Sequence, residues 1–218
     1  MPFHDRIDAA RQLGGELRRF AVDRPVVLAV PRGAVPMAEA IARELGGDLD
    51  VVLVRKLRAP FNPEFAVGAI DEAGWCYVAE YAAGAGANPA YLEREKRDQL
   101  ELLRRRRASY TPGRDALPVA GRVAIVVDDG LATGATMIAA LHGVAARNPK
   151  KLVCAVPVAS REALGKVAPY CDEIVCLESP ADFQAVGQFY AEFPQVDDAE
   201  VGAILRGYAR PRKLEHSA

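Results

Sequence analysis

The sequence predicts an α/β protein with a mainly parallel sheet and helices on both faces, and three observations support this. Short apolar runs rich in β-branched residues, such as Val123–Val127, recur along the chain and suit strands buried on both faces. Segments with helical spacing of apolar residues lie between these runs, which is the order of a parallel sheet with helical crossovers. Small residues and turn residues follow several of the strands. Because open α/β sheets bind ligands at the carboxyl ends of their strands, we expect any site there.

The sequence of the first quarter of the chain predicts two helices, each followed by a strand. Residues 5–20 should form a helix whose apolar side consists of Ile7, Ala10, Leu13 and Leu17. The first strand is expected at 26–30, and the sequence PRGAVP (Pro31–Pro36) follows it. Its second proline suits the first turn of a helix over 37–45, and its glycine permits unusual backbone angles. A second strand is expected at 50–54.

Prolines and glycines interrupt the next segment, residues 59–87, before a long helix begins. Residues 69–70 and 75–78 are expected to pair as a hairpin. Asn88 then suits the cap of a helix over 89–108, with a proline in its first turn.

The second half of the chain repeats the alternation of strands and helices. Apolar runs and helical spacing predict strands at 123–127, 152–158 and 173–177, and helices beginning near 137, at 161–167 and at 197–208. We expect one domain over residues 1–218, a length that supports an ample core.

Composition and charge favour a cytoplasmic protein that binds neither nucleic acid nor membrane. The 28 basic and 29 acidic residues almost cancel, so no global charge favours either surface. Four cysteines form no CxxC pair, and three scattered histidines show no metal-ligand spacing. Reduced core thiols are therefore expected. The amino terminus lacks the apolar core of a signal peptide, and no apolar run reaches membrane-spanning length.

The run VAIVVDDGLATGATMIAAL carries the clearest chemistry. Asp128 and Asp129 follow the strand directly, and a loop of small residues with two hydroxyls, residues 130–136, leads into a helix. Backbone N–H groups of such a loop, together with the helix N-terminus, suit a phosphate. The carboxylates suit the vicinal hydroxyls of a sugar. This combination predicts a site for a ribose 5-phosphate.

The segment VVDDGLATGATM resembles the phosphoribosyl-pyrophosphate (PRPP) signature of type I phosphoribosyltransferases, and is most similar to their adenine and uracil branches. The alternative is a generic acidic strand end, as in receiver domains or a Mg²⁺ site of another α/β protein. The resemblance implies that PRPP is bound by Asp128, Asp129, Ala132, Thr133, Gly134, Ala135 and Thr136. A side chain added at Gly134 is expected to lie at the anion and to conflict with the backbone angles of the loop.

Two further segments gain meaning from the resemblance. PRGAVP resembles the loop that holds pyrophosphate in this family, which implies roles for Arg32 and Gly33; the alternative is a simple turn. Arg55, Lys56 and Arg58 come at the end of the expected second strand and would bind the leaving pyrophosphate, with Lys56 as a point charge. Their alternative is a solvated basic turn. The resemblance thus implies Lys56, Asp128 and Asp129 as the catalytic set, without an assigned metal ligand.

The implied activity is that of a Mg²⁺-dependent pentosyltransferase of nucleotide metabolism on a Rossmann-like fold. A nitrogen nucleophile, for example a nucleobase, would displace pyrophosphate from the anomeric carbon of PRPP. A homodimer is compatible with the family. The alternatives are a PRPP-sensing regulator without turnover, and a binding protein or hydrolase for PRPP or another sugar phosphate.

The resemblance also implies a mobile segment over about 59–87 and a C-terminal hood over about 181–218. The hood aromatics could stack on a planar acceptor, although packing within the hood is the better interpretation; they are Phe183, Phe189, Tyr190 and Phe193. Ala132 stands where hypoxanthine-guanine enzymes carry an aspartate, which argues against a 6-oxopurine handled in the same way. Candidate acids or bases in the mobile segment are Glu64, Asp71, Glu72 and Glu80. PRGAVP, VRKLRAPFNPEFAVGAI and FQAVGQFYAEFPQVDD also resemble a group of phosphoribosyltransferases whose acceptor is unassigned.

Overall fold

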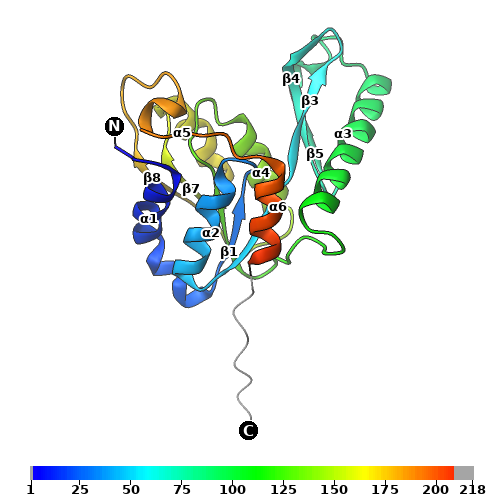
Figure 1. The fold of residues 1–218 in the computed structure, drawn as a ribbon. Coiled ribbons are helices and arrows are strands. Elements are labelled where there is room, and N and C mark those ends of the chain that lie inside the picture. Colours follow the sequence, from blue (N-terminus) through cyan, green and yellow to red (C-terminus); the bar gives the residue numbers. More distant parts are fainter. Residues whose placement is uncertain (1, 209–218) are drawn as a thin grey trace.

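The computed structural model of the protein describes residues 2–208, apart from the side chain of Glu64. Within this range, five parallel strands form a central sheet in the order β2-β1-β6-β7-β8 (Figure 1). Their bounds are Val26–Ala29 (β1), Asp48–Val51 (β2), Val123–Val127 (β6), Lys151–Val158 (β7) and Glu173–Glu178 (β8). The predicted parallel sheet is confirmed. Residues 209–218, the end of the predicted C-terminal hood, lie outside the described residues.

Helices cover both faces of this sheet, as predicted. α1 (Arg6–Leu17) and α2 (Ala34–Leu45) pack on one face, and α4 (Ala135–Ala145) and α5 (Arg161–Val167) pack on the other. Alternate strand residues divide between the two cores, so that Val27 belongs to the first and Leu28 to the second. Every residue of β6 is buried, which explains its unbroken apolar run.

Capping residues begin the helices where the sequence indicated. Asp5 accepts a hydrogen bond from Asp8 N at the start of α1, and Asn88 accepts one from Tyr91 N at the start of α3 (Pro89–Tyr110). Asp197 caps α6 (Asp198–Gly207). Short 3-10 helices lie at Arg18–Asp23, Glu80–Ala82, Ala168–Tyr170 and Val186–Phe189. No helix in residues 2–208 combines the length and the apolar character that a membrane crossing needs.

A second sheet and α3 form an arm that projects away from the central sheet (Figure 1). The sheet contains β3 (Val54–Ala59), β4 (Asn62–Asp71) and β5 (Cys76–Val78), all antiparallel. The predicted hairpin is confirmed, since Ala69 pairs with Tyr77 and Ile70 with Cys76. We refer to residues 54–110 as the arm.

The predicted second strand, 50–54, was wrong at its end because the chain changes sheets there. Val52 N still donates to Ala29 O of the central sheet at 3.0 Å. Leu53 O instead accepts from Glu72 N of the arm. β2 therefore ends at Val51, and Val54 begins β3.

The amino-terminal residues pair with a segment near the other end of the described chain. Phe3 forms a parallel bridge with Tyr190; Phe3 N donates to Phe189 O at 3.2 Å, and Ala191 N donates to Phe3 O at 3.0 Å. This pairing brings the start of α1 against residues 181–197, which we call the C-terminal segment.

Candidate functional site

The two loops singled out in the sequence lie side by side at the carboxyl edge of the central sheet. β1 and β6 are neighbours, with Ala29 opposite Val127, and Val30 N donates to Val127 O at 2.9 Å. The loop that starts at Pro31 and the pair Asp128–Asp129 therefore leave the sheet next to each other. The structure brings these predicted elements together.

Each of the two carboxylates uses one oxygen within the protein. Oδ1 of Asp128 accepts a hydrogen bond from Asp129 N at 2.9 Å. Oδ2 of Asp129 accepts two hydrogen bonds from Arg6, from Nε at 3.0 Å and Nη2 at 2.9 Å. Among the described residues, no donor reaches Oδ2 of Asp128 or Oδ1 of Asp129. Two adjacent acceptor oxygens thus remain for a ligand.

Burial makes this pair costly to ionise. Burial raises the pKa of Asp128 well above its ordinary value, and the neighbouring charge of Asp129 adds to the rise. Burial also raises the pKa of Asp129, although the Arg6 guanidinium opposes that rise. The pair therefore combines two like charges with one close cation.

Arg6 is a site residue that sequence reasoning missed. Its side chain is 10% exposed, and its Nη1 donates to the carbonyl of Pro194 at 2.5 Å. The guanidinium lies 3.7 Å from the centroid of the Phe193 ring. The Tyr190 hydroxyl donates to Asp129 O at 2.7 Å, so α1 and the C-terminal segment meet at this carboxylate. No motif connects position 6 with position 129, which explains the miss.

Gly33 is required for a close approach. Its φ of −56° is open to any residue, so the expected unusual backbone angle was wrong. A Cβ at this position would lie 2.0 Å from Oδ2 of Asp129 and 3.1 Å from Nε of Arg6. The peptide bond between Pro31 and Arg32 is cis. Arg32 is exposed, and its charge acts on Tyr110 of α3: burial raises the pKa of that phenol, and Arg32 opposes the rise.

The small-residue loop forms the N-terminus of α4. Thr133, Ala135 and Thr136 are exposed there, and the first amides of a helix have no intrahelical acceptor. Ser160 fixes the loop from behind: its Oγ donates to Ala132 O at 2.9 Å and its N–H to Leu131 O at 2.9 Å. The result is an exposed set of donors on a supported backbone.

Gly134 has the special backbone angle that was expected, and it also packs against α5. Its φ is +77°, a conformation that glycine adopts without strain, and it precedes the first residue of α4. A Cβ here would lie 3.0 Å from Cγ2 of Val167 and 3.4 Å from Ala163 O, both in α5. A side chain would therefore enter the contact with α5. The expected position of such a side chain at the anion stays a prediction.

The three predicted cations lie within β3, where α3 engages two of them. Arg55 Nε donates to Oε1 of Gln99 at 2.5 Å, and Arg58 Nε to Oε1 of Glu95 at 3.0 Å. Register shifts around Arg58 turn both arginines toward the same helix. Lys56 is exposed. The position expected for these cations, at the end of a strand of the central sheet, was wrong because the chain has changed sheets by Val54.

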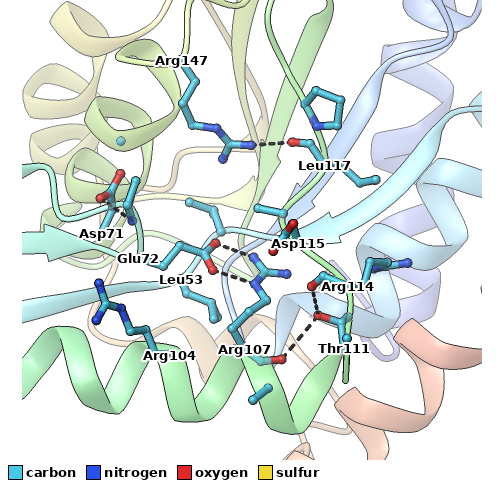
Figure 2. A pocket seen from close by; sticks show the side chains of 17 residues that line it. Leu53, Asp71, Glu72, Arg104, Arg107, Thr111, Arg114, Asp115, Leu117 and Arg147 are labelled. Carbon is cyan, nitrogen blue, oxygen red and sulfur yellow. Dashed lines mark hydrogen bonds and ion pairs between the residues drawn. The ribbon is translucent and has the colours of Figure 1, made fainter.

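A cavity of about 680 Å³ lies at the base of the arm, away from the two loops (Figure 2). In its wall Arg107 Nε donates to Glu72 at 2.6 Å, and Nη1 donates to the fully buried Asp50 at 2.7 Å. Figure 2 shows Arg104 and Arg147 on opposite sides of this cavity. None of its lining residues belongs to 31–33 or 128–136. The carboxylates of Asp50 and Glu72 are matched within the protein.

Two of the candidate acids and bases of the arm have structural partners. Asp71 accepts hydrogen bonds from Ala73 N and Trp75 N and so shapes the hairpin turn. Glu72 is paired with Arg107. Glu80 begins a 3-10 helix, and the side chain of Glu64 lies outside the described part of the chain.

The aromatic residues of the C-terminal segment pack on one another. The ring centroids of Phe183 and Phe189 are 5.3 Å apart, and those of Tyr190 and Phe193 are 4.7 Å apart. Phe189 and Tyr190 are buried, which confirms packing within the segment for these two. Gly130 lets Val186 of this segment approach, because a Cβ there would lie 2.6 Å from Cγ1 of Val186.

The described residues hold no group of three or more His, Cys, Asp or Glu side chains that could bind a metal ion. Mg²⁺ commonly binds through substrate phosphates, water and few carboxylates. Asp128 and Asp129 are carboxylates that could hold such an ion together with a phosphate-bearing ligand.

Known proteins are similar to this chain in sequence and in fold. A family model described as phosphoribosyl transferase domain matches residues 5–193. The Mycobacterium tuberculosis H37Rv protein named "Putative phosphoribosyl transferase Rv0571c" is 45% identical over 204 residues, which cover 93% of this chain and 46% of that protein. The same figures hold for its counterpart MT0597 from strain CDC 1551 / Oshkosh. The chain thus spans about half the length of the curated relatives it matches.

Solved structures support the fold. The crystal structure of TT1426 from Thermus thermophilus has a TM-score of 0.84 and 47% sequence identity, and covers 94% of this chain and 98% of that chain. A Neisseria gonorrhoeae protein with bound ppGpp has a TM-score of 0.51 at 13% identity, with 94% of each chain covered. The latter likeness concerns the fold alone.

Proposed function

Since this chain belongs to the phosphoribosyl transferase domain family, we propose that it transfers the phosphoribosyl group of PRPP to a nitrogen nucleophile. One observation carries the proposal: two half-buried carboxylates, at the carboxyl end of β6 and just before the N-terminus of α4, each keep one oxygen without a partner in the described chain. Ligands of open α/β sheets bind at this edge, so two adjacent free acceptors here favour a ligand that supplies donors.

Ribose 5-phosphate fits this arrangement in both of its parts. The 2′- and 3′-hydroxyls would donate to Oδ2 of Asp128 and Oδ1 of Asp129. The 5′-phosphate would accept from the amides of residues 132–136 and from the exposed hydroxyls of Thr133 and Thr136. Both partners lie within one continuous strand–loop–helix segment.

The leaving group would lie over the neighbouring loop. The nitrogen–carbon bond forms as the bond from the anomeric carbon to the pyrophosphate oxygen breaks, and pyrophosphate keeps the electron pair. Arg32 and the start of α2 would face the growing negative charge. Lys56 would join them only by an approach of the arm. Mg²⁺ on the diphosphate would supply further charge neutralisation.

The proposal specifies the acceptor only as a nitrogen nucleophile. Ala132 has no carboxylate to offer to an acceptor, and its carbonyl oxygen is engaged by Ser160. We also propose that the arm and the C-terminal segment belong to one domain with the sheet. The four free cysteines fit a cytoplasmic location.

The phosphate assignment can be tested without disturbing the α5 contact. Ala135→Glu adds a negative charge at the exposed first residue of α4, where a helix tolerates carboxylates well. We expect it to abolish ribose 5-phosphate binding in calorimetry, whereas the neutral Ala135→Gln retains most of it. Thr133→Ala should weaken binding by about 0.5–1.5 kcal/mol. Equal affinities of the Glu and Gln variants would place the phosphate elsewhere.

Turnover is tested by screening nitrogen bases with PRPP and Mg²⁺ for pyrophosphate release. Release that depends on one base supports the transferase and identifies the acceptor. PRPP binding without release under any condition would favour a regulator, and release in the absence of any base would favour a hydrolase.

A further inference from the structure

The contacts of Arg6 go beyond those of a surface ion pair. From its place in α1, the guanidinium reaches the carboxylate of Asp129, the carbonyl of Pro194 and the ring of Phe193. Gly33 leaves just enough space for the contact with Asp129. Because both hydrogen bonds from Arg6 end on Oδ2, the other oxygen of Asp129 is left for a ligand. The orientation of the carboxylate is thus set from the side opposite the proposed ribose.

Resting on the proposed function, we infer that Arg6 is a positioning residue of the ribose site, which keeps Asp129 ionised and turns its Oδ1 toward the sugar hydroxyls. An ionised carboxylate accepts hydrogen bonds at both oxygens, whereas a protonated one gives up part of this capacity. Arg6 forms both charge-assisted hydrogen bonds described for Asp129, whereas Asp128 lies beside it as a like charge.

The other groups around Asp129 supply no replacement. The Tyr190 hydroxyl donates to the main-chain oxygen of Asp129 and leaves its carboxylate untouched. Cys154 of β7 is buried beside Asp128, and burial raises the pKa of this thiol, so it stays neutral. Gly33 faces the carboxylate from the neighbouring loop without a side chain. Removal of Arg6 therefore leaves two adjacent, half-buried carboxylates without a close cation among the described residues.

The test compares Arg6→Met, which keeps much of the side-chain volume, with Arg6→Lys, which keeps the charge. Ribose 5-phosphate binding is measured by calorimetry in EDTA between pH 6 and 9. At pH 7 we expect Arg6→Met to weaken binding roughly tenfold or more. We also expect its affinity to rise more steeply with pH than that of the wild type, because loss of the cation raises the pKa of Asp129. Arg6→Lys should recover part of the loss and the wild-type pH profile.

Two controls separate positioning from packing. Arg18 lies just after α1, and its exposed side chain pairs with Glu44. Arg18→Met should therefore leave ribose 5-phosphate binding unchanged. Phe193→Leu removes the ring beneath the guanidinium and leaves the charge. If Phe193→Leu reproduced both the loss and the pH profile of Arg6→Met, packing of the C-terminal segment would explain the effect and the inference would be overturned.

The other possible results of these titrations also test the inference. Tighter binding by Arg6→Met would mean that Arg6 competes with the sugar for Asp129, and an unchanged pH profile would remove the electrostatic role; either result overturns the inference alone. If the wild type failed to bind ribose 5-phosphate at all, the proposed function would fall together with it. Carboxyl-carbon NMR gives an independent reading, since the pKa of Asp129 should rise in Arg6→Met and return toward wild type in Arg6→Lys.

Discussion

Two charge clusters in this molecule differ in how completely their carboxylates are paired. At the base of the arm, the guanidinium of Arg107 contacts Asp50, Glu72 and the carbonyl of Val51. At the carboxyl edge of the sheet, Asp128 and Asp129 share one close cation and keep two oxygens without donors among the described residues. The first cluster joins the arm to the sheet, whereas the second one leaves two acceptor oxygens open.

This difference teaches how to tell an architectural cluster from a candidate site. Both clusters are rich in charge, and the arm base even borders the cavity of about 680 Å³. A choice by cavity size alone would therefore select the arm base and not the pair Asp128–Asp129. Residues that serve function commonly reduce stability, whereas a buried ion pair such as Arg107–Asp50 is expected to destabilise the fold only when a partner is removed. Variants of the two clusters should thus change different properties.

The largest effect is expected at the arm base. Arg107→Met would leave the fully buried Asp50 and the nearby Glu72 without their main cation. We expect a loss of about 3–5 kcal/mol in the free energy of unfolding, measured by chemical denaturation. Arg105→Met is the matched control, since its exposed pair with Glu101 should contribute about 0.5 kcal/mol or less. A similar, small change in both variants would contradict the architectural role.

A ligand-binding effect of intermediate size is expected at the sheet edge. Asp128→Asn keeps the acceptor for Asp129 N but loses the charge that the sugar hydroxyls would meet. We expect ribose 5-phosphate affinity to fall by roughly 1.5–3 kcal/mol in calorimetry. Glu95→Gln, in the arm, should leave this affinity unchanged. Unaltered binding by Asp128→Asn would remove the ribose assignment.

The same substitution should stabilise the protein, by about 1 kcal/mol at pH 8. Because the pKa of Asp128 is raised in the folded state, the folded protein holds that proton more tightly than the unfolded chain does. Stability is therefore lost as pH rises from the unfolded pKa through the folded one. The unfolding temperature of Asp128→Asn should exceed that of the wild type at pH 8. This difference should become smaller toward pH 5. A difference in unfolding temperature that grew on acidification would contradict this prediction.

The smallest effect is expected for Lys56→Ala. Lys56 is exposed on β3, so stability and ribose 5-phosphate affinity should not change. PRPP binding should weaken by roughly 0.2–1 kcal/mol if the arm brings this charge to the pyrophosphate. An equal loss for both ligands would indicate a general disturbance of the site. The comparison needs both titrations on one protein batch.

Local sequence patterns predicted the fold and the carboxylates of the candidate site, but not Arg6. The apolar run of β6, the cap residues and the proline and glycine positions describe short segments, and the structure confirms the elements built on them. Asp128 and Asp129 were found because strand, carboxylates and loop are continuous in sequence. Their role still awaits the tests above.

Long-range contacts account for what the sequence did not reveal. Arg6 meets Asp129 across 123 positions, and no local pattern encodes that contact. The change of sheets after Val51 depends on hydrogen bonds with Ala29 of the central sheet and Glu72 of the arm, which only the assembled protein provides. The direction of the missing side chain at Gly134 depends on α5, which begins much later in the chain.

The hydrogen bond from Arg6 to Pro194 joins residues 188 positions apart, which bears on the order of folding. Contacts that close such long segments are entropically expensive and form slowly compared with local ones. A nascent chain can complete β6 and its acidic turn before the segment that holds Arg6 in place has left the ribosome. We therefore expect ribose 5-phosphate binding to appear after most far-ultraviolet circular dichroism during refolding, whereas simultaneous recovery would show that the sheet and the arginine contact form together.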